Sequence, residues 1–420
     1  MTVTMRGARL AAFVLVLGAS SLATSGAPAP KESNGTPAAR TLFAEGEAAA
    51  KAGKHVEAAA AFRKAIEADP DFVEAHQQFI QSTRRDQSGP KARPLAELYA
   101  QWAKQDPSRA AYQWALGFLE QEPAKADVFF NRALKLDPAF ARAHFSLARN
   151  ADLRGDWQAQ RRHLAAAVES NPDEPQYLVK FAQAHRDSDP PRFRELASSV
   201  VEKFPQSPSA ADALYQLTRA SSGTERRNYY ERLRGSYPAD KFGYSSLAMG
   251  NYYGELAVPA EALSLARDMV KWFPASKTWA QRVAHQEAMM SAEALVDQRR
   301  FSEALAAIEK TQKPSGAHGA TWVLLKARAA AGAGQVGQAY NAVVESVAAA
   351  PSDRMDAALA DYGKELKKTR EEIDADIWRV RDAKAVAAAP LELPGSKDGK
   401  PVRLSDYRGR VVLLAFWFPG

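Results

Sequence analysis

The stretch LFAEGEAAAKAGKHVEAAAAFRKAIEADP, from Leu42 to Pro70, decides the fold. It predicts two short amphipathic helices, because apolar residues recur every three or four positions on either side of a tight turn at Ala52-Gly53-Lys54. Gly46 and Ala49 are small and let the first helix backbone come close to the second. Pro70 ends the second helix, since proline lacks an N–H and disfavours helix in the residue before it.

Similar helix endings recur along the chain at a nearly constant spacing. Pro138 and Pro172 are 34 residues apart, and the next two steps are 33 residues each. The prolines that end these helices are Pro70, Pro138, Pro172, Pro205, Pro238, Pro274 and Pro351. A period of about 34 residues with this pattern resembles the tetratricopeptide repeat.

Small and large residues at fixed positions carry the resemblance in three copies. They are Leu42, Gly46, Ala49, Ala58, Phe62, Ala65 and Pro70; Leu147, Ala148, Leu164, Ala167 and Pro172; and Gly250, Tyr253, Ala262 and Pro274. The pattern is weaker at Phe79-Ile80, and segments 86–135 and 280–320 are irregular in length. Residues 86–94, DQSGPKARP, are expected to form a long loop.

The resemblance implies an all-α tetratricopeptide-type superhelical solenoid over residues 41–351, with eight or nine helical pairs. Residues 352–389 are rich in Ala, Glu, Lys and Arg and are expected to form capping helices and a linker, with an acidic and basic face from Lys364 to Glu372. Solenoids of this type hold a protein or peptide partner in their groove, and this is the partner that we expect.

The N-terminal residues differ from the rest of the chain. Arg6 and Arg9 precede an apolar run from Leu10 to Leu17, and Ala27-Pro28-Ala29 follows. This order predicts a secretory signal peptide at residues 1–29, followed by a polar linker at 30–40. We therefore expect a periplasmic or secreted protein without a lipoprotein cysteine, which contacts the membrane only through this segment if it stays uncleaved.

Composition excludes several kinds of chemistry. The chain has 56 basic and 49 acidic residues, a net charge of +7, and no basic cluster with interleaved aromatics, so nucleic-acid binding is not expected. Its 420 residues include no cysteine, which excludes thiolate chemistry and cysteine-based zinc sites within them.

No residue is predicted to serve catalysis, a cofactor or a metal. His76 and His144 hold the same position in their repeats and are interpreted as packing residues. His285 with Glu287 lacks the spacing of a zinc protease helix. Two glycine-containing strings, Gly332-x-Gly334-x-x-Gly337 and Gly395 to Pro401, are interpreted as turns rather than dinucleotide or phosphate sites.

Aromatic residues concentrate between positions 229 and 279. Most are expected to pack helices together, and some to line the groove; which ones do so stays open. They are Tyr229, Tyr230, Tyr252, Tyr253, Trp272, Phe273 and Trp279.

Helical periodicity ends near Pro390. Asp398-Gly399 predicts a hairpin turn, Val402 and Leu404 alternate as in a half-buried strand, and the apolar run from Val411 to Phe418 predicts a strand buried on both faces. The text DGKPV, LSDY, RGRVVLL and FW resembles the opening of thioredoxin-like redoxins, so residues 390–420 are expected to begin an incomplete domain of that family.

The redoxin resemblance implies a Cys-x-x-Cys motif directly after the Phe416-Trp417 strand, beyond the end of this chain. Two functions stay open. One is an exported thiol–disulfide oxidoreductase or antioxidant redoxin whose repeats recruit its substrate. The other is a non-enzymatic scaffold or adaptor of the cell envelope.

Overall fold

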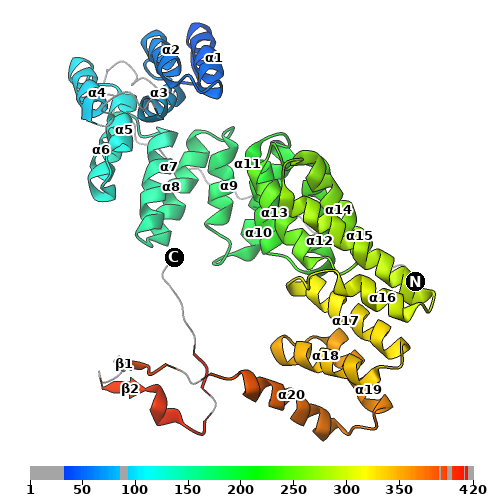
Figure 1. Cartoon of the computed structure of the whole chain (residues 1–420). Coiled ribbons are helices and arrows are strands. Elements are labelled where there is room, and N and C mark those ends of the chain that lie inside the picture. Colours follow the sequence, from blue (N-terminus) through cyan, green and yellow to red (C-terminus); the bar gives the residue numbers. More distant parts are fainter. Residues whose placement is uncertain (1–32, 86–92, 387–388, 395–399, 411, 415–420) are drawn as a thin grey trace, which may run out of the picture. The chain divides into compact units, whose positions relative to one another are not determined.

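A computed structural model describes residues 33–85, 93–386, 389–394, 400–410 and 412–414 of the 420-residue chain (Figure 1). The chain divides into two compact units, Met1–Ala220 and Ser221–Gly420. Together their described residues form twenty α-helices.

Unit 1 holds the first eleven helices. They are α1 (Pro37–Lys51), α2 (His55–Ala68), α3 (Val73–Arg85), α4 (Arg93–Gln105), α5 (Ala110–Leu119), α6 (Pro123–Leu136), α7 (Ala141–Leu153), α8 (Trp157–Ser170), α9 (Pro175–Gln183), α10 (Pro190–Lys203) and α11 (Pro208–Arg219).

Unit 2 holds nine helices and a small sheet. The helices are α12 (Gly223–Ser236), α13 (Gly243–Glu255), α14 (Pro259–Trp272), α15 (Lys277–Asp297), α16 (Phe301–Glu309), α17 (Gly316–Gly332), α18 (Val336–Ala349), α19 (Asp353–Glu365) and α20 (Arg370–Lys384). The strands are β1 (Glu392–Pro394) and β2 (Pro401–Arg403), followed by a short 3-10 helix η1 (Leu404–Tyr407).

The predicted helix endings are confirmed. A second helix of a pair ends two residues before each of the seven prolines, from α2 before Pro70 to α18 before Pro351. The residue just before the proline leaves helical geometry, as Asp69 does with φ −150° and ψ 94°. Its N–H still bonds the helix four residues back, so the proline ends the helix after its last hydrogen bond.

A recurring turn joins the two helices of several pairs. At Gly53 the chain takes φ +75°, with Gly53 N–H bonding Ala50 O and Lys54 N–H bonding Ala49 O, which is the Schellman arrangement. Gly155 and Gly334 hold the same place, so the glycine string at 332–337 does span a turn between helices, with Gly332 ending α17 and Gly337 in the first turn of α18. Arg299 and Lys367 adopt the same left-handed conformation, with φ of 61° and 59°, although a residue with a side chain adopts it less readily than glycine.

A glycine facing a large buried ring sets the helix spacing in two pairs. A Cβ placed on Gly46 of α1 would lie 2.6 Å from the ring of Phe62 in α2. A Cβ on Gly117 of α5 would lie 2.5 Å from Phe130 in α6. Both phenylalanine rings are fully buried. The two helices of each pair therefore meet at a separation that only a missing side chain allows.

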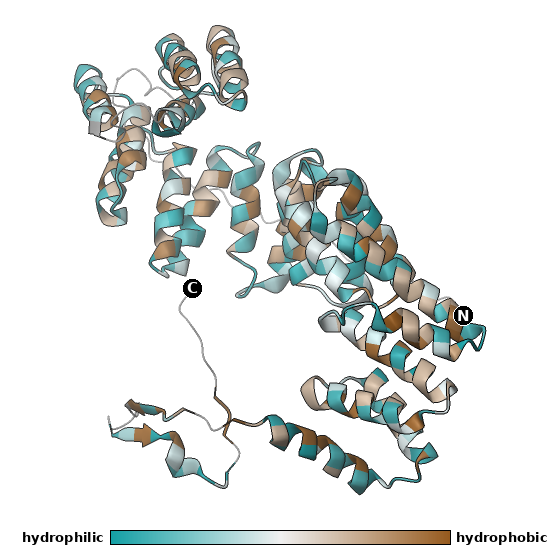
Figure 2. Cartoon of the chain, in the orientation of Figure 1, coloured by the Kyte–Doolittle hydropathy of each residue, from teal (hydrophilic) through white to brown (hydrophobic). Residues whose placement is uncertain are grey.

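One apolar core runs through the helices of unit 1 from Ala39 to Leu147, and two smaller clusters lie in unit 2 between Met289 and Ile377. Figure 2 shows polar and apolar residues alternating around the helices, as amphipathic packing requires. Within the described residues, every helix is too short or too polar to span a bilayer.

Several boundary and packing predictions need correction. The first helix begins at Pro37, where Thr36 caps it, rather than at Thr41. The segment from Lys364 to Glu372 is not one continuous helical face, because it comprises the end of α19, the connection 366–369 and the first turn of α20. Gly250 does not hold a close approach, since a Cβ there would meet nothing within 4 Å. Segment 86–94 is described only from Arg93, where α4 begins.

The C-terminal segment forms an antiparallel hairpin with Leu393 opposite Val402 and Pro394 opposite Pro401. This register leaves residues 395–400 between the strands, more than the two-residue turn expected at Asp398-Gly399, and 395–399 lie outside the described residues. Leu404 starts η1 and does not extend β2, so that prediction is wrong. Val412–Leu414 form no strand and are exposed, which contradicts a strand buried on both faces there; 411 and 415–418 lie outside the described residues. A partial thioredoxin-like domain is thus not formed by the described residues.

Replacing Gly117 by Ala tests the close approach. Alanine favours helix by about 1 kcal/mol, but the added methyl must displace the buried Phe130 ring, and overpacking costs about 1–3 kcal/mol. We expect Gly117→Ala to lower the free energy of unfolding by about 1 kcal/mol in urea titrations followed by circular dichroism.

Gly250→Ala is the matched control, because its methyl enters open space on a helix. We expect this variant to be stabilised by about 0.5–1 kcal/mol. If Gly117→Ala is stabilised equally, the ring does not hold the helix spacing.

Candidate functional site

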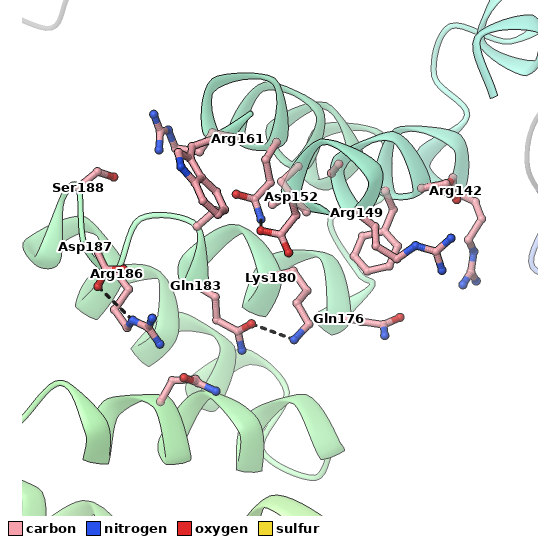
Figure 3. Close-up of a pocket in the computed structure, with 18 of the residues that line it drawn as sticks. Arg142, Arg149, Asp152, Arg161, Gln176, Lys180, Gln183, Arg186, Asp187 and Ser188 are labelled. Carbon is pink, nitrogen blue, oxygen red and sulfur yellow. Dashed lines mark hydrogen bonds and ion pairs between the residues drawn. The ribbon is translucent and has the colours of Figure 1, made fainter. Parts of the chain in front are cut away.

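A groove of about 1170 Å³ lies in unit 1. Its walls come from the first helices of successive pairs, α3, α5, α7, α9 and α11, with the start of α8 and the turn after α9. Figure 3 shows labelled side chains of α7, α8, α9 and the turn after α9 at this groove. The residues that line it are Gln77, Gln81, Trp114, Phe118, Arg142, Phe145, Ser146, Ala148, Arg149, Asp152, Trp157, Gln160, Arg161, Leu164, Gln176, Lys180, Gln183, Ala184, Arg186, Asp187, Ser188, Gln216 and Arg219.

Helix periodicity explains why these side chains share one surface. On α7, Arg142, Phe145, Arg149 and Asp152 are spaced by three or four residues and so project from one face. Gln176, Lys180 and Gln183 on α9 follow the same spacing. First helices also contact one another, α3 with α5, α5 with α7 and α9 with α11, so their faces combine into one surface.

Aromatic rings form part of this surface. Trp114 stacks on Phe118 with ring centroids 5.0 Å apart. Its Nε1–H donates to Ser146 Oγ at 2.9 Å, which fixes the indole against α7. Trp157, at the first position of α8, is 49% exposed and is the most accessible ring of the groove.

A buried carboxylate orders the side chains of α9 and α11. Asp212 is 3% exposed and accepts hydrogen bonds from Gln183 Nε2 and Gln216 Nε2, each at 3.0 Å. Lys180 Nζ lies 3.6 Å from the carboxylate and donates to Gln183 Oε1 at 2.8 Å (Figure 3). Because a carboxylate only accepts, it fixes the orientation of both amides.

Unit 2 has a second, smaller cavity of about 460 Å³. It too is lined mainly by first helices, α15, α17 and α19, with Met289, Leu324 and Leu325 as its apolar part. Its charged residues balance: Glu293, Asp361, Arg328 and Arg354. Arg328 lies 3.7 Å from Glu293 and 3.4 Å from Asp297.

The histidines at the equivalent repeat positions are packing residues, as predicted. His76 Nε2 donates to Pro70 O at 2.9 Å, so its Nδ1 accepts from the Tyr99 hydroxyl at 2.9 Å. His144 repeats this with Pro138 O and takes His163 as its other partner, both at 3.1 Å. Burial lowers the pKa of His76 to about 4.

None of the seven aromatic residues singled out between 229 and 279 lines either cavity, and four of them pack against one another in pairs. Tyr230 stacks on Tyr252 at 4.7 Å, and Tyr253 meets Trp279 edge-on at 5.5 Å. Arg282 lies over both rings of the second pair, 4.5 Å from Tyr253 and 4.1 Å from Trp279. The rings that do line the groove, in α5, α7 and α8, were not singled out from the sequence, although their helical spacing could have found them.

His285 and Glu287 do not form a site together, since Glu287 pairs with Arg267 at 2.8 Å. In the described part of the chain, no three His, Asp or Glu side chains gather closely enough to share a metal ion. The string from Gly395 to Pro401 lies mostly outside the described residues.

The family model of the tetratricopeptide repeat matches residues 39–72, which are α1, α2 and the turn into α3. No curated protein matches the chain. The chain thus carries a tetratricopeptide repeat within an all-α fold of helical pairs.

Three solved structures are similar to parts of the chain. A tetratricopeptide protein of Thermus thermophilus is 14% identical and covers 47% of this chain and 99% of its own, with a TM-score of 0.33. PilW, a type IV pilus biogenesis factor, is 16% identical and covers 48% of this chain and 95% of its own, with a TM-score of 0.36. PilF of Pseudomonas aeruginosa is 16% identical and covers 51% of this chain and 97% of its own, with a TM-score of 0.36.

The buried His76 predicts a loss of stability in acid. Its pKa is lowered on folding, from about 6.5 to about 4, so its stabilising contribution is complete above pH 6.5 and is lost as the pH falls toward 4. We expect this residue to account for about 3 kcal/mol of the loss between pH 7.5 and 4.

His76→Gln provides the comparison, measured by urea unfolding across this pH range. It should be less stable than the parent at pH 7.5, yet it should lose about 3 kcal/mol less on acidification. Parallel stability profiles for the two proteins would show that His76 is not buried in its neutral form.

Proposed function

We propose that this protein is a tetratricopeptide-type scaffold for protein–protein interaction, and that the unit 1 groove binds a segment of a partner polypeptide. The observation that carries the proposal is the groove itself. Five first helices present side chains to one open surface, and a family match at α1 and α2 identifies the repeat type. Repeat arrays use such surfaces to bind partners.

The chemistry of the surface suits a polypeptide. Six glutamine side chains line it, and a primary amide can both donate and accept hydrogen bonds, as the groups of a peptide backbone do: Gln77, Gln81, Gln160, Gln176, Gln183 and Gln216. Some of these groups already have partners within the chain, since Gln77 Oε1 accepts from Arg142 and Gln160 Nε2 donates to Asp152. Exposed Trp157 adds a ring that can receive an apolar side chain of the partner. The Asp212 network holds two of these amides in place before binding, which reduces the entropy lost on association.

A redoxin is the second candidate function. Its support is the resemblance over residues 398–417 and the pairing of β1 with β2 on either side of the predicted turn. The 420-residue chain has no cysteine, so it should not reduce insulin in a dithiol-dependent assay. Reading the DNA that follows codon 420 tests this candidate: a Cys-x-x-Cys sequence there favours it, and a stop codon removes it.

We further propose export through residues 1–29, which lie outside the described residues. Its support is the order of positive, apolar and small residues in that segment. N-terminal sequencing of the protein from fractionated cells tests it. Recovery from the cytoplasm with Met1 intact contradicts export.

Crosslinking can test whether the groove is the binding surface. Two variants carry a benzophenone amino acid, one at position 157 and the other at position 128. Each is mixed with a random peptide library and irradiated, and the crosslinked peptides are identified by mass spectrometry. Trp157 is 49% exposed in the groove, and Val128 on α6 is 50% exposed outside it. We expect peptides to be captured at 157 only, because only that position faces the shared surface.

The two variants match in exposure and in unit, so nonspecific capture would label both equally. Capture at 128 alone, or at both positions alike, contradicts the proposed groove. Circular dichroism of both proteins confirms that the probe leaves the helices intact.

A further inference from the structure

The unit 1 groove carries positive charge that its own carboxylates leave unneutralised. Six basic and two acidic residues line it. The two acidic ones already have partners: Asp152 accepts from Gln160 Nε2 at 2.9 Å, and Asp187 pairs with Arg186 at 3.3 Å. The remaining carboxylate nearby, Asp212, is buried beneath its two glutamines.

Three arginines account for the excess. Arg149 on α7, Arg161 on α8 and Arg219 on α11 line the groove, and none of them lies within ion-pair distance of a carboxylate among the described residues. Figure 3 shows the guanidinium groups of Arg149 and Arg161 separated along the groove. Charge of one sign in a concave surface concentrates its field and attracts groups of the opposite sign.

The cavity of unit 2 provides an internal comparison. It is also built from first helices, but it has equal numbers of acidic and basic lining residues. Its Arg328 already faces two carboxylates. Positive excess is therefore a property of the unit 1 groove and does not follow from the repeat architecture as such.

We propose that the unit 1 groove binds an extended, acidic segment of a partner protein, whose carboxylates are bound by Arg149, Arg161 and Arg219. The proposal rests on the peptide-binding function proposed above and specifies its substrate class. Guanidinium groups suit this role because they form two parallel hydrogen bonds with one carboxylate. The aromatic rings and glutamines of the groove then contact the apolar side chains and the backbone of the same segment.

The arrangement of charges favours a peptide over a single-stranded nucleic acid. Asp152 and Asp187 lie on the same surface as the arginines. A nucleic acid carries a phosphate at every nucleotide and must place some of them against these carboxylates. An acidic peptide can place neutral residues there and carboxylates opposite the arginines. Basic nucleic-acid grooves, by contrast, follow the backbone with positive charge throughout.

The test uses three peptide libraries of equal length with the same randomised apolar positions. Their remaining positions are Glu, Ser or Lys. Binding to the full chain is measured by fluorescence anisotropy at several salt concentrations, with an oligothymidylate of similar length as a fourth probe. We expect the Glu library to bind at least about tenfold more tightly than the others at low salt, and to weaken as salt rises.

Neighbouring arginines on α8 provide the matched variants. Arg161 lines the groove, whereas Arg162 is exposed on the same helix and does not. We expect Arg161→Gln to weaken binding of the Glu library about threefold to fivefold. Arg162→Gln should leave it unchanged, and combining Arg149→Gln, Arg161→Gln and Arg219→Gln should abolish the preference for Glu over Ser. Arg149, Arg162 and Arg219 are exposed and Arg161 is half-buried. Gln at these positions keeps helix propensity, and circular dichroism checks the fold.

The outcomes separate this inference from the function beneath it. Equal binding of the Ser and Glu libraries, with capture at position 157, leaves a peptide groove but overturns its acidic preference. Tighter binding of the oligothymidylate than of the Glu peptides, or equal loss in Arg161→Gln and Arg162→Gln, also overturns it. Absence of any peptide at position 157 contradicts the proposed function itself.

Discussion

Close contact between the two helices of a pair is the constraint on which the described repeats depend. At Gly46 and Gly117 a glycine on the first helix receives a buried phenylalanine ring from the second, leaving no space for even a methyl group. Small apolar residues elsewhere in the pairs, such as Ala167 in α8, are likewise fully buried. Each pair thereby becomes a thin unit with apolar surface left over, and this surface is buried only when the next pair packs on it.

The groove is a consequence of that packing. Second helices take up the contacts with the core on one side, and first helices contact one another, α3 with α5 and α9 with α11. One face of each first helix therefore does not pack in the core and can carry polar groups. In unit 1 this face holds arginines, glutamines and rings, ordered from below by Asp212 and Ser146. The same construction in unit 2 carries balanced charge, so the scaffold and the chemistry of its surface vary independently.

Local sequence determines the helix ends and turns well. Pro70 and the later prolines each follow a helix end, because their effect is confined to the backbone of adjacent residues. The positive φ of Gly53 and Gly334 was likewise predictable, whereas Arg299 and Lys367 take the same conformation without a sequence signal. The same capping hydrogen bonds close these turns, with Arg300 N–H bonding Leu295 O and Lys368 N–H bonding Gly363 O, and local propensity does not reveal them.

The sequence predicted that a groove exists, but it did not identify the residues that line the groove. The sequence pattern indicated the aromatic residues near Tyr253 as candidates for the groove. Tyr253 in α13 instead packs against Trp279 in α15. Whether an aromatic residue faces a core or a groove depends on which helix is the neighbour, and periodicity alone gives only the face. Val412–Leu414 also depend on their neighbours, because an apolar run forms a strand only where it can pair with a sheet.

Hydrogen–deuterium exchange of the full chain, with and without a Glu-library peptide that binds it, tests the central claim most directly. The account predicts slower amide exchange in α7, α9 and α11, whose faces form the groove, and unchanged exchange in α2, α6 and α10. Slower exchange confined to those second helices, or spread evenly over unit 1, would contradict a binding surface formed by the first helices.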